Sequence, residues 1–109
     1  MNVNISTKDD IVIITIEGSI DSKTAGDLQS QIIGKVSESD KVMLVLSKVD
    51  FVSSAGLRIL LMVYRQINAK NGKVVLVGVS EEIKDVMSMT GFINFFEISE
   101  NIDDAHKLF

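Results

Sequence analysis

The stretch from Val49 to Gln66 reads VDFVSSAGLRILLMVYRQ, and it marks the change from a strand-like segment to a helix. Its apolar side chains recur at intervals of three and four residues, which is the spacing of one face of an α-helix. Ser53 and Ser54 stand at the start of this pattern, where backbone N–H groups lack partners inside the helix. A helix is therefore predicted from Ser54 to Ala69. Its apolar face is formed by Leu57, Leu60, Leu61, Tyr64 and Ile67.

The two serines fit three different roles. Serine is a preferred N-cap, because its hydroxyl accepts a hydrogen bond from an amide two or three residues further on. A helix N-terminus also favours a phosphate, and the small neighbours Ala55 and Gly56 leave room for another protein's active site. An enzyme nucleophile is disfavoured, because the G-x-S-x-G elbow is missing and the one histidine, His106, lies near the C-terminus. The local sequence leaves capping and phosphorylation open.

Strands and helices alternate on both sides of this junction. The second strand is predicted to end at Gly18, and Ser47 to Asp50 are predicted to connect the third strand to the apolar residues before the serines. The order β-β-α-β-α-β-α-β-α indicates an α/β sandwich with a mixed, mostly parallel sheet and helices mainly on one face. The predicted strands are Asn2 to Thr7, Ile11 to Glu17, Lys41 to Leu46, Lys73 to Val79 and Phe95 to Ile98. The predicted helices are Thr24 to Val36, Ser54 to Ala69, Ser80 to Met89 and a short one after Asn101.

Composition and charge narrow the class of protein. With 109 residues, 46% of them hydrophobic and 24% charged, the chain fits one globular domain over residues 1–109. The formal net charge of −4 and the scattered basic residues argue against a nucleic-acid partner. Cysteine is absent, histidine occurs once, and no carboxylate set has calcium-loop spacing. We therefore expect neither a metal nor a cofactor.

Localisation and assembly can also be predicted. The N-terminus lacks the basic segment and apolar core that are typical of a signal peptide. The longest apolar run, Ile59 to Tyr64, is far shorter than the roughly 20 residues that span a bilayer. We expect a cytoplasmic protein without direct membrane insertion, as a monomer or weak dimer.

The helix after the serines is apolar on more than one side. Ile59, Met62 and Val63 lie off its main apolar face, so this helix is either wedged between two others or exposes a partner-binding patch. Arg58 and Arg65 share a side of the helix. Both are expected to be solvated, but Arg58 lies one turn from Ser54 and is also placed to pair with acidic groups of a partner.

Four segments resemble one known family. The motif FVSSAGL, from Phe51 to Leu57, with the strand before it and the apolar helix after it, resembles the signature of STAS domains. More narrowly, it is similar to that of bacterial anti-sigma factor antagonists. The resemblance continues in ITIEGSIDSKTA from Ile14 to Ala25 and in GKVVLV from Gly72 to Val77. It also includes Ile83 to Ile93, where MTGFI matches the family's third helix and the turn after it. It covers nearly the whole chain.

This resemblance implies a switch without enzymatic activity. Such antagonists bind an anti-sigma factor that is also a serine kinase. The kinase phosphorylates the antagonist and thereby ends the binding, and a PP2C-like phosphatase restores it. The family's phosphoacceptor position falls on Ser54, with Ser53 as the second candidate. Ser53 stands where the family pattern has an aspartate. Asp21 matches an acidic loop residue beside the phosphorylation site.

Eight residues are predicted to form the partner-binding site. They are Asp21, Ser53, Ser54, Ala55, Gly56, Arg58, Ile59 and Met62. The alternative function is that of a constitutive STAS subunit, never phosphorylated, in a lipid-transport complex or a stress-signalling scaffold.

Overall fold

A five-stranded sheet organises the chain, and the computed structural model describes every residue from 1 to 109. The strands lie in the order β1-β2-β3-β4-β5. β1 is antiparallel to β2, and the other neighbouring pairs are parallel, so the predicted mixed, mostly parallel sheet is confirmed. The strands are β1 (Asn2–Lys8), β2 (Ile11–Ile20), β3 (Lys41–Val52), β4 (Lys73–Val77) and β5 (Glu97–Ser99).

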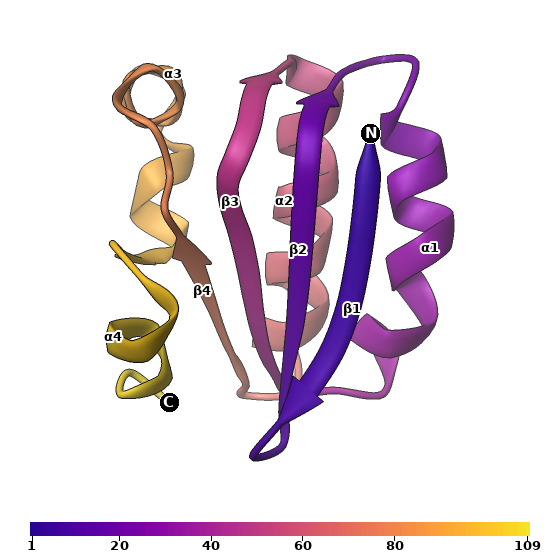
Figure 1. Cartoon of the computed structure of the whole chain (residues 1–109), viewed down its shortest axis with the longest axis vertical. Helices are drawn as coiled ribbons and strands as arrows, with labels where there is room; N and C mark the ends of the chain where they lie inside the picture. The colour runs from indigo at the N-terminus through magenta and orange to yellow at the C-terminus, as the bar shows by residue number, and fades with distance from the viewer.

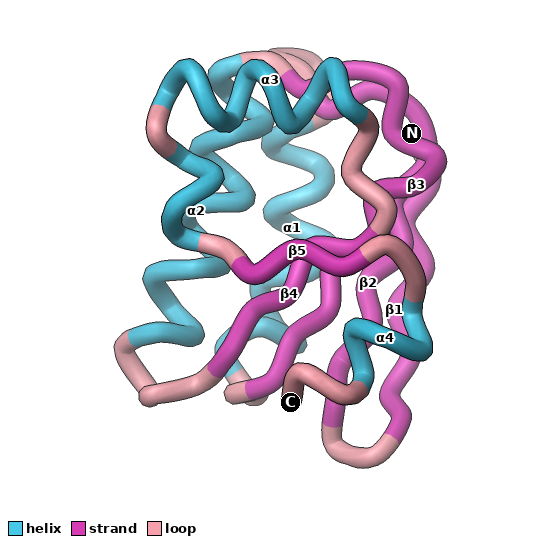
Figure 2. The backbone as a smooth tube through the Cα atoms, turned by 90° about the vertical axis from the view of Figure 1, so that its left-hand side faces the viewer, coloured by secondary structure: helices cyan, strands magenta, loops and turns pink.

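The helices divide unequally between the two faces of the sheet (Figures 1 and 2). α1, α2 and α3 share the larger core, while α4 covers a smaller cluster on the other face, with Met43, Val75 and Ala105. Helices mainly on one face were predicted, and this is confirmed. No helix has the length and apolar character needed to cross a membrane. The helical segments are α1 (Ala25–Ser37), α2 (Ser54–Asn68), α3 (Glu81–Thr90), the 3-10 helix η1 (Phe92–Phe95) and α4 (Ile102–His106).

The central strands are longer than predicted. Gly18 does not end β2, and the predicted connection from Ser47 to Asp50 lies inside β3. The two strands continue to pair with each other, Ser19 opposite Phe51 and Ile20 opposite Val52, across two interruptions of the register. Such β-bulges break the alternation of apolar and polar residues, which is why the sequence pattern looked like a loop.

The boundaries of the last strands also differ from prediction. β4 ends at Val77 rather than Val79, because Gly78 has a φ of +69°, which is incompatible with continued strand geometry. Phe95 belongs to η1, and β5 begins at Glu97. Aromatic packing holds this segment, with the rings of Tyr64 and Phe96 in an edge-to-face arrangement at 5.6 Å between centroids.

Lys70 closes the C-terminal end of α1. Its ammonium group donates hydrogen bonds to the carbonyls of Val36, Ser37 and Ser39, at 2.9, 2.7 and 2.8 Å. The last carbonyls of a helix lack partners inside it and carry partial negative charge. Lys70 thus ties the segment after α2 to α1.

Lys70→Met should lower the free energy of unfolding by about 1 kcal/mol, because three carbonyls lose a charged donor. Urea denaturation measures the change. Lys8→Met is the matched control, since Lys8 is exposed on β1 without an ion pair. Equal stability of the two variants would contradict a capping role for Lys70.

Candidate protein-binding surface

The predicted site lies at the edge of the sheet where β2 and β3 end. Because these strands are parallel, both carboxyl ends reach the same edge. The backbone N–H of Ser53 donates to the carbonyl of Ile20 at 2.9 Å, which joins the start of α2 to the end of β2. In Figure 1 the two arrowheads lie side by side at the top, beside the first turn of α2.

The two serines have different positions in this structure. Ser53 is the N-cap of α2, and its hydroxyl oxygen accepts a hydrogen bond from the N–H of Gly56 at 3.3 Å. Ser54 is the first residue of the helix, is exposed to solvent, and makes no side-chain hydrogen bond. Capping therefore belongs to Ser53, and the hydroxyl of Ser54 is free for another interaction.

Gly56 allows the helix to approach β2 closely. A Cβ at this position would lie 2.6 Å from the carbonyl oxygen of Ile20 and 2.9 Å from Cγ1 of Val52. No ordinary side chain fits at such distances, so a glycine in the first turn is explained by packing. Gly56 was predicted to contact a partner, but it is buried against β2 and β3.

Ile59 was also predicted to contact a partner, but in this structure it packs into the interior of the domain. Its side chain is only 9% exposed and belongs to the main core. Val63 is fully buried, and Met62 is partly buried against the same core. α2 is thus largely wedged between neighbouring elements, because residues outside its main apolar face also pack against the core.

Asp21 organises the loop between β2 and α1. Its carboxylate accepts hydrogen bonds from the backbone N–H groups of Lys23 at 2.9 Å and Thr24 at 3.1 Å. The Thr24 hydroxyl donates to the carbonyl of Ser19 at 2.9 Å, so the loop is anchored to the end of β2. The hydrogen bond from Lys23, followed by those from Thr24, lowers the pKa of Asp21 against the opposing effect of desolvation.

The lowered pKa of Asp21 predicts a specific pH dependence. A carboxyl whose pKa is depressed by folding stabilises the folded state above its unfolded pKa, and this stabilisation is lost as the pH falls through the folded pKa. Asp21→Ala should therefore be less stable than wild type at pH 7, and the difference should shrink below pH 3.8, the ordinary pKa of the group. Urea denaturation at pH 7 and at acidic pH measures this, and a constant difference would contradict the assignment.

The remaining predicted residues lie near Ser54 or along α2. Ala55 is partly exposed in the first turn. Arg58 is exposed one turn further on, and no carboxylate of the chain pairs with it. Asp21, Ser53, Ser54 and Ala55 are therefore brought together by the two strand ends, and Arg58 extends this surface along the helix.

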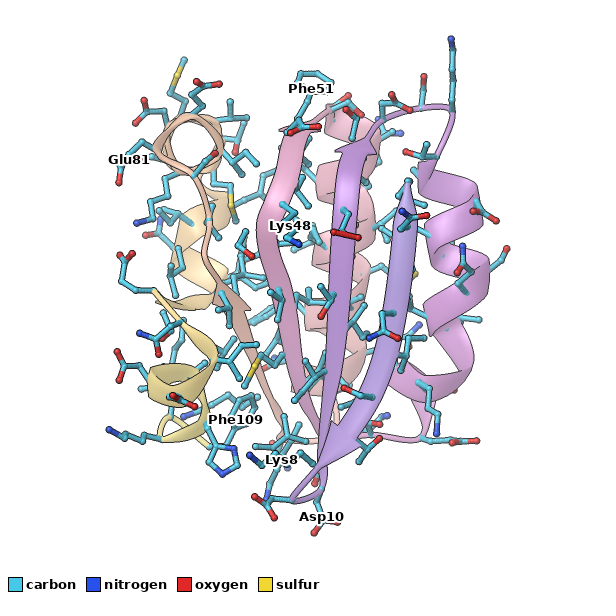
Figure 3. The ribbon with its side chains drawn as sticks, viewed as in Figure 1. Lys8, Asp10, Lys48, Phe51, Glu81 and Phe109 are labelled. Carbon is cyan, nitrogen blue, oxygen red and sulfur yellow. The ribbon has the colours of Figure 1, made fainter.

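Phe51 belongs to this surface and was missed as a site residue. Its side chain is 55% exposed, although it lies in β3 between Asp50 and the buried Val52. Figure 3 shows it at the upper edge of the sheet. Regular alternation would place Phe51 on the same face as the buried Val49, but Asp50 is an extra residue in the pairing with β2 and turns Phe51 outward. The only signal in the sequence was the position of this phenylalanine at the start of the FVSSAGL motif, two residues before the serines.

The surface is neither a pocket nor a metal centre. The largest cavity, about 430 Å³, is lined by polar residues around Asp10, Lys35 and Asp40 and includes none of the predicted site residues. No cluster of histidine or carboxylate groups is arranged to hold a metal. An open surface with an exposed aromatic side chain suits contact with another protein.

Comparison with known proteins identifies the family. The family model of the STAS domain matches residues 2–105. The chain belongs to the STAS domain family. It is 27% identical over 110 residues to BtrV of Bordetella bronchiseptica, which is provisionally named an anti-sigma factor antagonist. The match covers 100% of this chain and 95% of BtrV.

Solved structures agree with this fold. An anti-sigma factor antagonist from Mycobacterium paratuberculosis is 25% identical, with a TM-score of 0.88 over 98% of this STAS chain and 92% of that protein. The Bacillus cell fate determinant SpoIIAA in its phosphorylated form has a TM-score of 0.77 at 16% identity, over 97% of each chain. The relatives are described as antagonists of another protein and not as enzymes, in agreement with the predicted non-enzymatic role.

Proposed function

We propose that this STAS chain is an anti-sigma factor antagonist that binds its anti-sigma factor through the surface formed by Phe51, Asp21, Ser54 and Arg58. Its relatives of similar length bear that description. The observation that carries the proposal is the contrast between two adjacent serines. Ser53 is used as the cap of α2, whereas Ser54 is exposed and has no hydrogen-bond partner.

Phosphorylation of Ser54 would act as the switch. A phosphate adds a charge of about −1.5 to −2. The first turn of α2 contains no acidic residue and presents free amides, so the folded domain accommodates that charge. In a close-packed interface the same group is bulky and strongly hydrated, and it opposes binding. A serine kinase, which we propose is the anti-sigma factor itself, and a PP2C-like phosphatase would set the two states.

A phosphorylation assay tests this assignment. The purified chain is incubated with ATP and the anti-sigma factor kinase encoded nearest to its gene, and the modified residue is mapped by mass spectrometry. Wild type and Ser53→Ala should be labelled, whereas Ser54→Ala should not. Labelling of Ser54→Ala at the wild-type level would contradict the assignment.

Ser53 at the usual aspartate position is the observation that favours the alternative function. Without that carboxylate, the surface lacks a feature of the kinase-recognition pattern that the resemblance implies. A constitutive subunit of a lipid-transport or stress-signalling assembly would show no labelling of any serine and would remain stably bound to its assembly during purification.

A further inference from the structure

The outward side of α2 carries positive charge that the rest of the chain leaves unpaired. Arg58 and Arg65 are both exposed, and neither forms an ion pair. No acidic residue occurs anywhere in α2. Several lysines elsewhere do pair with glutamates, among them Lys48 with Glu17 at 3.4 Å. In a chain of net charge −4, this helix face is locally basic.

Apolar side chains lie between the two arginines. Leu61 and Met62 are partly exposed, and helical spacing places them on the same side as Ser54, Arg58 and Arg65. We call these five residues the α2 stripe. A surface with unpaired arginines around partly exposed aliphatic groups complements an acidic, partly apolar protein segment.

We propose that Arg58 is the group through which phosphate on Ser54 controls partner binding. In the unmodified protein, Arg58 pairs with a carboxylate of an acidic segment of the anti-sigma factor docked along the α2 stripe. In the modified protein, Arg58 pairs with the phosphate. This inference rests on the function proposed above and adds the chemistry of the partner and the means of release.

Helix geometry supports the exchange of partners. Ser54 and Arg58 are four residues apart, which places their side chains next to each other on the helix surface. A guanidinium group binds phosphate through two parallel hydrogen bonds. The partner's carboxylate then loses its counter-charge and faces a dianion instead. Arg65 is eleven residues from Ser54, about 16 Å along the helix axis, and is too distant to take the same role.

The intramolecular contact is measurable without any partner or kinase. Phosphoserine is incorporated at position 54 during translation, and the phosphate is titrated by ³¹P NMR. A nearby arginine lowers the second phosphate pKa, ordinarily about 6, so Arg58→Gln should raise it by about half a unit or more. Arg65→Gln is the matched control and should leave it unchanged. Equal values for wild type and Arg58→Gln would overturn the proposal.

Binding of the purified anti-sigma factor tests whether Arg58 contributes to the contact with the partner in the unmodified protein. Arg58→Glu should weaken binding of the unmodified protein at least tenfold, and Arg58→Gln should do so to a smaller extent. If wild type fails to bind the anti-sigma factor, the proposed function is wrong, while the NMR result still decides the phosphate contact. If wild type binds and Arg58→Glu binds equally well, only the role of Arg58 is wrong.

Discussion

Replacing Gly56 by alanine is expected to destabilise the protein by about 1–3 kcal/mol. The added Cβ would lie 2.6 Å from the backbone oxygen of Ile20, and a backbone carbonyl in a central strand cannot move aside easily. Alanine ordinarily stabilises a helix by about 1 kcal/mol relative to glycine, so the clash must exceed this gain. The displaced helix start would also move Ser53 and Ser54, and partner binding should fall with stability.

Gly34→Ala is the matched control for this prediction. Gly34 lies in α1, and a Cβ there would meet no atom within 4 Å other than those of its chain neighbours and its own helix backbone. This variant should be more stable than wild type by about 0.5–1 kcal/mol. Urea denaturation of both variants measures the difference. If the two substitutions changed the free energy of unfolding by the same amount and in the same direction, the close approach of α2 to β2 would be contradicted.

Phe51→Ala should weaken binding of the anti-sigma factor by about 10- to 100-fold, which corresponds to about 1.4–2.7 kcal/mol. Exposed aromatic side chains at the centre of an interface often contribute most of its binding energy. The side chain is 55% exposed in the free protein, so its loss should change the free energy of unfolding by less than about 1 kcal/mol.

Ile102→Ala provides the control for Phe51. Ile102 is also exposed, by 43%, but it lies in α4, outside the proposed surface. Binding by this variant, measured by isothermal titration calorimetry, should equal that of wild type. If Phe51→Ala retained full affinity, the partner would not cover the carboxyl end of β3.

The order of strands and helices could be predicted because each element has a regular apolar pattern. β-branched residues define β2, and the spacing of Leu57, Leu60 and Ile67 defines α2. The start of α2 at Ser54 was also predictable, since serine caps precede the first apolar turn. That single boundary separates the roles of Ser53 and Ser54.

Features that depend on pairing between distant segments could not be predicted. The register shifts between β2 and β3 place Ser47 to Asp50 inside a strand and turn Phe51 outward. Neither effect leaves a regular period in the sequence. The burial of Ile59 and the close contact of Gly56 likewise depend on how α2 sits against β2 and its neighbouring helices.

Binding of the anti-sigma factor to protein that carries phosphoserine at position 54 tests the central claim most directly. Isothermal titration calorimetry should show affinity at least about 100-fold lower than for the unmodified protein, about 2.7 kcal/mol. Treatment with a phosphatase should restore it. Equal affinities before and after treatment would contradict the claim that Ser54 is the switch.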